Sequence, residues 1–139
     1  MAAATAPINT PERFGGVVSY PVAAATNIYA GTLVAVNTSG QAVPAADAAN
    51  LKVVGRAEAD ALNGSGAAGD LSVPIKRGTF RFANSGSDAV DADDVQKVCY
   101  VADDTTVREG TGTNSIKAGL VLAVDADGVW VDTALAQAI

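Results

Sequence analysis

Hydrophobic and polar residues alternate in short runs along most of this chain. Runs of this kind, rich in Val and bounded by Gly, Asn, Asp or Ser, are typical of strands with one buried face. The pattern predicts strands over residues 16–20, 32–37, 41–44, 51–59, 71–76, 79–83, 96–102, 105–108, 117–124 and 128–133. Short strands at this spacing indicate an all-β fold, a compact antiparallel β-barrel or sandwich.

Signals for helices are scarce. Residues 44–50 combine a proline with several alanines, which favours a single helical turn. Residues 91–94 read Asp-Ala-Asp-Asp, and acidic residues are favoured in the first turn of a helix. This second segment is predicted to start a short helix or to lie in a solvated loop.

Two segments of the chain repeat one pattern. Residues 30–43 align with residues 118–131 without a gap: an apolar run ends at Asn37 or Asp125, a short turn follows, and a second run returns. Asn, Asp and Gly tolerate the positive φ angles of tight hairpins. Both segments are therefore predicted to be hairpins, produced either by duplication or by two turns of the same geometry.

The first fifteen residues differ from the rest. Two prolines hold their neighbours extended, and no hydrophobic period lies between them. The sequence predicts an extended N-terminal arm over residues 1–15 and a single all-β domain over residues 16–139, with a disordered tail as the alternative to the arm. The residues of this arm proposed to contact a partner are Ile8, Asn9, Arg13 and Phe14.

Gly64, Gly66 and Gly69 match the glycine spacing of dinucleotide-binding loops. Such a loop must open a helix whose amides face the phosphates. Here the alternating residues 71–76 follow, with a proline among them, so this segment is predicted to be a loop between strands. No cofactor is expected.

Catalytic and metal-binding chemistry has little support in the composition. The 139 residues include no histidine, which removes the commonest general base and metal ligand. Cys99 is the single cysteine and lies in an apolar run, so it is predicted to be a buried structural thiol. The acidic clusters lack the pattern of a helix-loop-helix calcium site. We expect neither an enzyme nor a metal protein.

The net charge of −6 and the isoelectric point near 4.3 argue against direct binding to nucleic acid. The densest basic group, Lys76 and Arg77 with Arg81, is predicted to be an exposed strand face or a partner contact. The N-terminus lacks the basic and apolar regions of a signal peptide, and no run approaches the roughly 20 apolar residues of a membrane span. A soluble protein without a membrane partner is expected.

Three stretches carry a resemblance to a known family. They are VVSYPVAAATNIYAGTLVAVNTSGQAVPA, then VVGRAEADA followed by AGDLSVPIKRGTFRF, and then ADDVQKVCYVADDTTVREGTGTNSIKAGLVLAVDADGVWVDT. Together they resemble the decoration, or cement, proteins of tailed-bacteriophage capsids. The likeness covers roughly residues 16–133 and rests on the order of the three stretches, since each hairpin motif alone is common.

The resemblance implies a small all-β protein that is made in the cytoplasm of a bacterial host and binds the outer surface of a matured icosahedral head. It implies the major capsid protein as partner, a homotrimer as the favoured oligomer, and stabilisation of the head against internal DNA pressure. It supplies no catalytic residues. Tyr29, Tyr100 and Trp130 are the first candidates for the oligomer interface, with core packing as their alternative role.

Two other function classes remain as alternatives. A carbohydrate-binding or adhesin-like β module on the virion would expose an aromatic platform. An enzyme that uses paired acids would need carboxylates that converge in a cleft.

Overall fold

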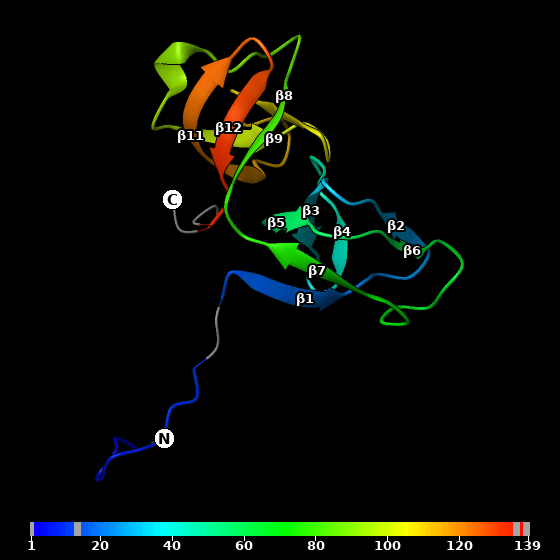
Figure 1. The fold of residues 1–139 in the computed structure, drawn as a ribbon, viewed down its shortest axis with the longest axis vertical. Coiled ribbons are helices and arrows are strands. Elements are labelled where there is room, and N and C mark those ends of the chain that lie inside the picture. The colour runs from blue at the N-terminus through cyan, green and yellow to red at the C-terminus, as the bar shows by residue number, and fades with distance from the viewer. Residues whose placement is uncertain (1, 13–14, 135–136, 138–139) are drawn as a thin grey trace.

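The computed structural model describes residues 2–12, 15–134 and 137 of the chain. It contains a closed five-stranded barrel, an open five-stranded sheet and a two-stranded ribbon (Figure 1). The all-β prediction is confirmed. The sequence left a barrel or a sandwich open, and the structure contains a barrel beside an open sheet.

Antiparallel pairs build the whole open sheet, in the order β1-β7-β5-β3-β4. Its strands are β1 (Val17–Pro21), β3 (Leu33–Val36), β4 (Ala42–Pro44), β5 (Lys52–Ala57) and β7 (Ser72–Lys76). The ribbon pairs β2 (Thr26–Ile28) with β6 (Ala61–Asn63). These two strands were not predicted from the sequence.

The barrel has the strand order β10-β8-β12-β11-β9, and β9 pairs with β10 to close it. Its strands are β8 (Thr79–Asn84), β9 (Val98–Val101), β10 (Thr106–Arg108), β11 (Lys117–Asp125) and β12 (Gly128–Asp132). Four of the pairs are antiparallel, and β8 pairs with β10 in parallel. Closure leaves no free edge in this part of the molecule, which removes a common cause of aggregation.

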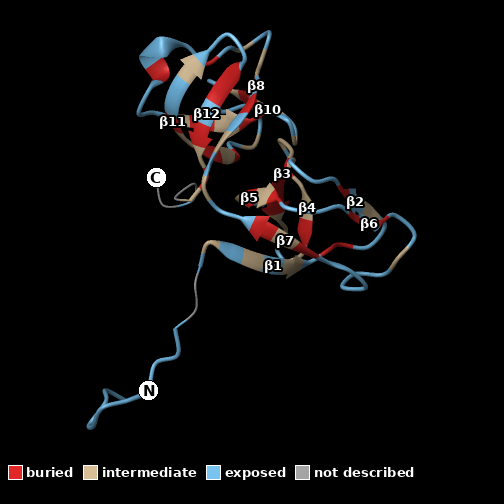
Figure 2. Ribbon diagram, in the orientation of Figure 1, coloured by how far each residue is buried: buried red, intermediate tan, exposed pale blue. Residues whose placement is uncertain are grey.

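The alternation in the sequence sorts side chains between core and surface. In β12, Val129 and Val131 are fully buried, whereas Trp130 between them is 37% exposed. In Figure 2, strands of both the barrel and the open sheet carry buried residues. The barrel core also contains Leu33, Ala35, Ala45 and Val53 from the part of the chain that forms the open sheet. Barrel and sheet therefore share buried surface rather than standing apart.

Both predicted hairpins are present, one in each sheet. The β3–β4 turn is held by Asn37, whose Oδ1 accepts hydrogen bonds from the amides of Ser39 (2.9 Å) and Gln41 (3.0 Å). The β11–β12 turn is held by Asp125, whose Oδ1 accepts from the amides of Asp127 (2.8 Å) and Gly128 (3.1 Å). The same turn chemistry thus sets the register of both hairpins.

The two helix predictions have opposite outcomes. The helical turn over residues 44–50 is wrong: Pro44 ends β4, and the residues after it form bends and turns. The acidic segment does form a short 3₁₀ helix, η1 (Ala92–Asp94). Asp94 stabilises its start by accepting a hydrogen bond from the Asp91 amide at 2.8 Å.

The glycine-rich segment lies in the loop between β6 and β7, as predicted. Buried Asn63 anchors this loop, because its Nδ2 donates hydrogen bonds to the carbonyl oxygens of Ala23 and Ala67, each at 3.0 Å. Residues 2–12 form no helix or strand, are exposed, and extend away from the sheets (Figure 1). Their role as a binding arm stays a prediction.

Candidate functional site

The residues proposed for the arm are described only in part. Ile8 is 76% exposed and Asn9 is exposed as well, so both side chains are free to contact a partner. Arg13 and Phe14 lie outside the described residues. An isoleucine this exposed gains hydrophobic free energy only when another molecule covers it.

The three aromatic residues proposed for an oligomer interface come from separate elements. Tyr29 follows β2 and is 54% exposed, Trp130 lies on the outer face of β12, and Tyr100 is half-buried in β9. Core packing is therefore the wrong role for Tyr29 and Trp130. Within the described chain no contact joins the three rings, so they do not form one aromatic platform. Their place in an interface stays a prediction.

A groove of about 540 Å³ lies where the chain passes from β7 to β8, between the open sheet and the barrel. We call it the waist groove. Basic and aromatic side chains dominate its lining, which consists of Gly31, Arg56, Lys76, Thr79, Phe80, Arg81, Phe82 and Trp130. Three of the nine basic residues of an acidic chain thus line one surface feature.

Strand register places these side chains together. Arg56 of β5 pairs with Lys76 of β7, and Arg81 of β8 pairs with Trp130 of β12. The guanidinium of Arg56 lies 4.0 Å from the centroid of the Phe80 ring, and that of Arg81 lies 5.9 Å from Trp130. Both distances fall in the range of cation–π attraction. The groove therefore has an aromatic lining with guanidinium groups held against it.

The cations of the waist groove are incompletely paired. Arg56 forms an ion pair with Glu58 at 2.9 Å, but its Nε is buried without a hydrogen-bond acceptor. Arg81 reaches Asp127 only at 3.8 Å, between two solvent-exposed side chains. No ion pair involves Lys76 in the described part of the chain. An anionic group could thus bind Lys76 and Arg81 without displacing a strong internal partner.

The sequence identified only part of this groove. Lys76 and Arg81 were grouped as an exposed face, and the structure confirms their exposure. Arg56 and Phe80 were missed. Arg56 is distant in sequence, and its pairing with Lys76 follows from the β5–β7 register, which no local pattern specifies.

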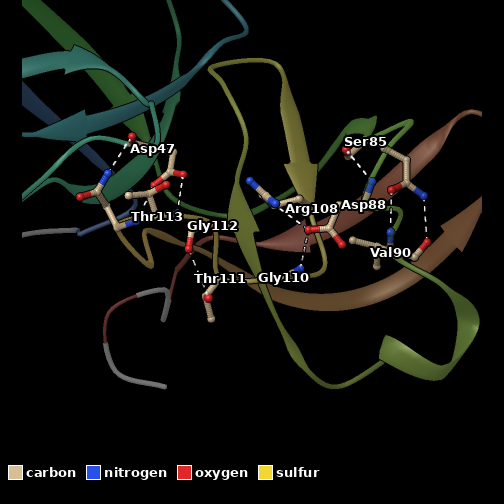
Figure 3. Close-up of polar contacts among 11 residues, drawn as sticks. Asp47, Ser85, Asp88, Val90, Arg108, Gly110, Thr111, Gly112 and Thr113 are labelled. Atoms are coloured by element: carbon tan, nitrogen blue, oxygen red, sulfur yellow. Dashed lines mark hydrogen bonds and ion pairs between the residues drawn. The ribbon is translucent and has the colours of Figure 1, made fainter.

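The acidic residues hold loops together instead of converging on a ligand. Figure 3 shows two such carboxylates, Asp47 and Asp88, on either side of Arg108. Asp88 accepts hydrogen bonds from Arg108 Nε at 2.9 Å and from the Gly110 amide at 3.0 Å. Among the described residues, no group of three or more His, Cys, Asp or Glu residues could hold a metal ion.

Asp47 binds the loop before β11. It accepts hydrogen bonds from the backbone amides of Thr113 (2.9 Å) and Asn114 (2.8 Å), while Asn114 Nδ2 donates to the Asp47 carbonyl oxygen (Figure 3). These amides, that of Thr113 first, lower the pKa of the Asp47 carboxyl below its ordinary 3.8. The role of this residue also explains why residues 44–50 do not form a helix, because its carboxylate faces another loop.

Asp47→Ala should lower the free energy of unfolding by about 1 to 2 kcal/mol at neutral pH, since it leaves two amides without their charged acceptor at a solvent-accessible site. A lowered pKa stabilises the fold above the ordinary pKa, and this contribution is lost as the pH falls through the folded value. The difference in chemical denaturation between wild type and variant should therefore shrink below pH 3.8. Asp47→Asn, which keeps one acceptor oxygen, should lose less. A pH-independent difference would contradict the assignment.

Cys99 is buried in β9, and burial raises the pKa of its thiol to about 12. The thiolate is the nucleophile that attacks thiol reagents, so the folded protein should be unreactive at neutral pH and should react once per chain in denaturant. A colorimetric thiol titration with and without guanidinium chloride checks this. Rapid reaction of the folded protein would place Cys99 at the surface.

No helix in the described residues is long and apolar enough to cross a membrane. A scan against protein-family models finds no match, and neither the curated proteins nor the solved structures contain a match to this chain.

Proposed function

We propose that this chain is a capsid decoration protein that binds the outer surface of a matured tailed-phage head as a homotrimer, with the major capsid protein as partner. The observation that supports this most is the exposed segment of residues 2–12, which extends from an all-β body (Figure 1). The ordered set of strand motifs that resembles cement proteins supports the same function. In this proposal the chain is a structural component of the virion and not an enzyme.

The mechanism has two parts. The all-β body is a rigid scaffold that self-associates, while the N-terminal segments order on neighbouring capsid subunits by adding a strand or burying Ile8. Each such contact is small, since a single isoleucine contributes about 1.5 to 3 kcal/mol when buried. Linking three copies multiplies the effect, because later contacts form at a high effective concentration. The protein thereby clamps capsid subunits that DNA pressure pushes apart.

The acidic surface fits this location. A net charge of −6 disfavours contact with packaged DNA and suits the outer face of a shell. Charged surfaces are common in proteins, so the net negative charge agrees with the proposal but is not the evidence on which it rests.

Co-sedimentation of the purified protein with undecorated heads tests the proposal. We expect saturable binding at a fixed ratio to the major capsid protein, with a preference for expanded heads over compact precursor shells. Absence of binding to either form would reject the function.

Carbohydrate binding is the second candidate, and one observation favours it. Trp130 is 37% exposed beside the waist groove, where its indole could stack on a sugar ring. The side chain is held in place, because Nε1 donates a hydrogen bond to Asp125 Oδ2 at 3.1 Å. Glycan binding that Trp130→Ala abolishes, in a protein that does not bind heads, would establish this function instead.

A further inference from the structure

The positive charge of the waist groove is only partly neutralised by acidic residues of the same chain. Lys76 and Arg81 are exposed at its rim, and the ion pair of Arg81 with Asp127 spans 3.8 Å. Exposed pairs at such distances contribute between zero and about 1 kcal/mol. The buried Nε of Arg56 adds a donor without an acceptor. Carboxylates with an apolar neighbour would complement both the cations and the aromatic lining formed by Phe80 and Trp130.

Most acidic side chains of the chain already have local partners. Asp47 and Asp88 hold loops, and Asp60, Asp70, Asp103, Asp125 and Asp132 accept hydrogen bonds from nearby backbone amides. These carboxylates are already bound to backbone amides of this chain, so they are poorly placed to contact a second molecule.

The η1 turn is different. Asp91 and Asp93 are exposed there, and neither forms an ion pair within the described chain. Val95, directly after the turn, is 38% exposed. We call Asp91, Asp93 and Val95 the acidic knob. It offers the carboxylate of Asp93, and that of Asp91, which also caps η1 in a capping box with the Asp94 backbone, beside an aliphatic side chain. This is the chemistry that the waist groove lacks.

The two features cannot meet within one molecule. The groove lies at the junction of the barrel with the open sheet, whereas the η1 turn lies at the far end of the barrel (Figure 1). Two complementary surfaces at separate places on one subunit produce a head-to-tail contact between copies, and such contacts close into rings when the rotation between subunits permits it.

We propose that the waist groove binds the acidic knob of a second copy of this chain, and that this contact builds the oligomer. Asp91 and Asp93 of one copy face Lys76 and Arg81 of the next, and Val95 packs against the aromatic lining. The inference rests on the proposed function for its choice of a closed homotrimer. It goes further by assigning the two surfaces that join the subunits.

Charge reversal tests this contact in the full-length protein. Lys76→Glu with Arg81→Glu should weaken self-association about tenfold or more in sedimentation velocity, because like charges then face each other. Asp91→Lys with Asp93→Lys should weaken it similarly. Combining all four substitutions restores opposite charges and should recover the oligomer. All these positions are exposed, so circular dichroism should match wild type for every variant. Variants with Asp91→Lys should lose some thermal stability, because the Asp91 side chain caps η1.

Lys52→Glu is the matched control, since it reverses an exposed strand lysine outside the groove and should leave the oligomer intact. Wild type should also dissociate with added salt. A monomeric wild type, an oligomer that tolerates both reversals, or a combined variant that stays dissociated would overturn the contact.

Head binding reports separately on the proposed function. An oligomer that follows the charge pattern but does not bind heads would retain the contact and reject the capsid function. Head binding by a protein that is monomeric in solution would reject the contact and retain the capsid function.

Discussion

Gly119→Ala is expected to destabilise the barrel by about 3 kcal/mol or more. Gly119 lies in β11 with φ of +156°, a conformation that L side chains rarely adopt. A Cβ atom there would overlap the carbonyl oxygen of Asp132 and approach Val131 in the neighbouring strand. The backbone would have to separate two paired strands inside a closed barrel, which cannot relax by moving an edge. Urea denaturation monitored by Trp130 fluorescence measures the loss.

Gly40→Ala is the matched control for this prediction. Gly40 has a positive φ of +73°, but nothing lies within 4 Å of an added Cβ. Only the conformational cost remains, about 1 to 2 kcal/mol. Equal effects of the two substitutions would show that the close approach of β11 to β12 does not matter.

Deleting residues 2–15 should abolish binding to heads while the protein stays folded and oligomeric. Among the described residues, the first backbone hydrogen bond to the sheet lies beyond this segment, since the Arg77 amide donates to the Gly16 carbonyl oxygen at 2.9 Å. Loss of three linked arms should weaken shell binding by about a hundredfold or more. Co-sedimentation measures binding, and sedimentation velocity measures the oligomer.

A shorter deletion distinguishes the effect of losing the contact residues from the effect of shortening the arm. Residues 2–6 contain only Ala and Thr, whereas Ile8 and Asn9 follow Pro7. Deleting residues 2–6 should therefore leave binding nearly unchanged, while Ile8→Asp should weaken it strongly. Full binding after removal of residues 2–15 would refute the arm.

The strands that pack against the core could be predicted well from sequence. Val129 and Val131 alternate with Trp130, and burial follows this alternation. The hairpin turns were equally readable, because Asn37 and Asp125 act locally on amides within four residues. Interactions between residues close in the chain can therefore be recognised from the local sequence.

Contacts between distant segments could not be predicted. Asp47 binds amides of Thr113 and Asn114, 66 and 67 residues away, and this tertiary contact overrode the helix propensity of its own segment. The waist groove likewise depends on the register of β5 against β7 and of β8 against β12. Its basic residues were visible in sequence, but their shared surface was not.

We propose that this protein reinforces a phage head. The most direct measurement is the temperature at which DNA-filled heads lacking decoration release their DNA, with and without saturating protein. The account predicts that bound protein raises this temperature, and that protein lacking residues 2–15 does not. An unchanged release temperature at full occupancy would contradict it, since a protein that binds the shell without strengthening it is not a cement.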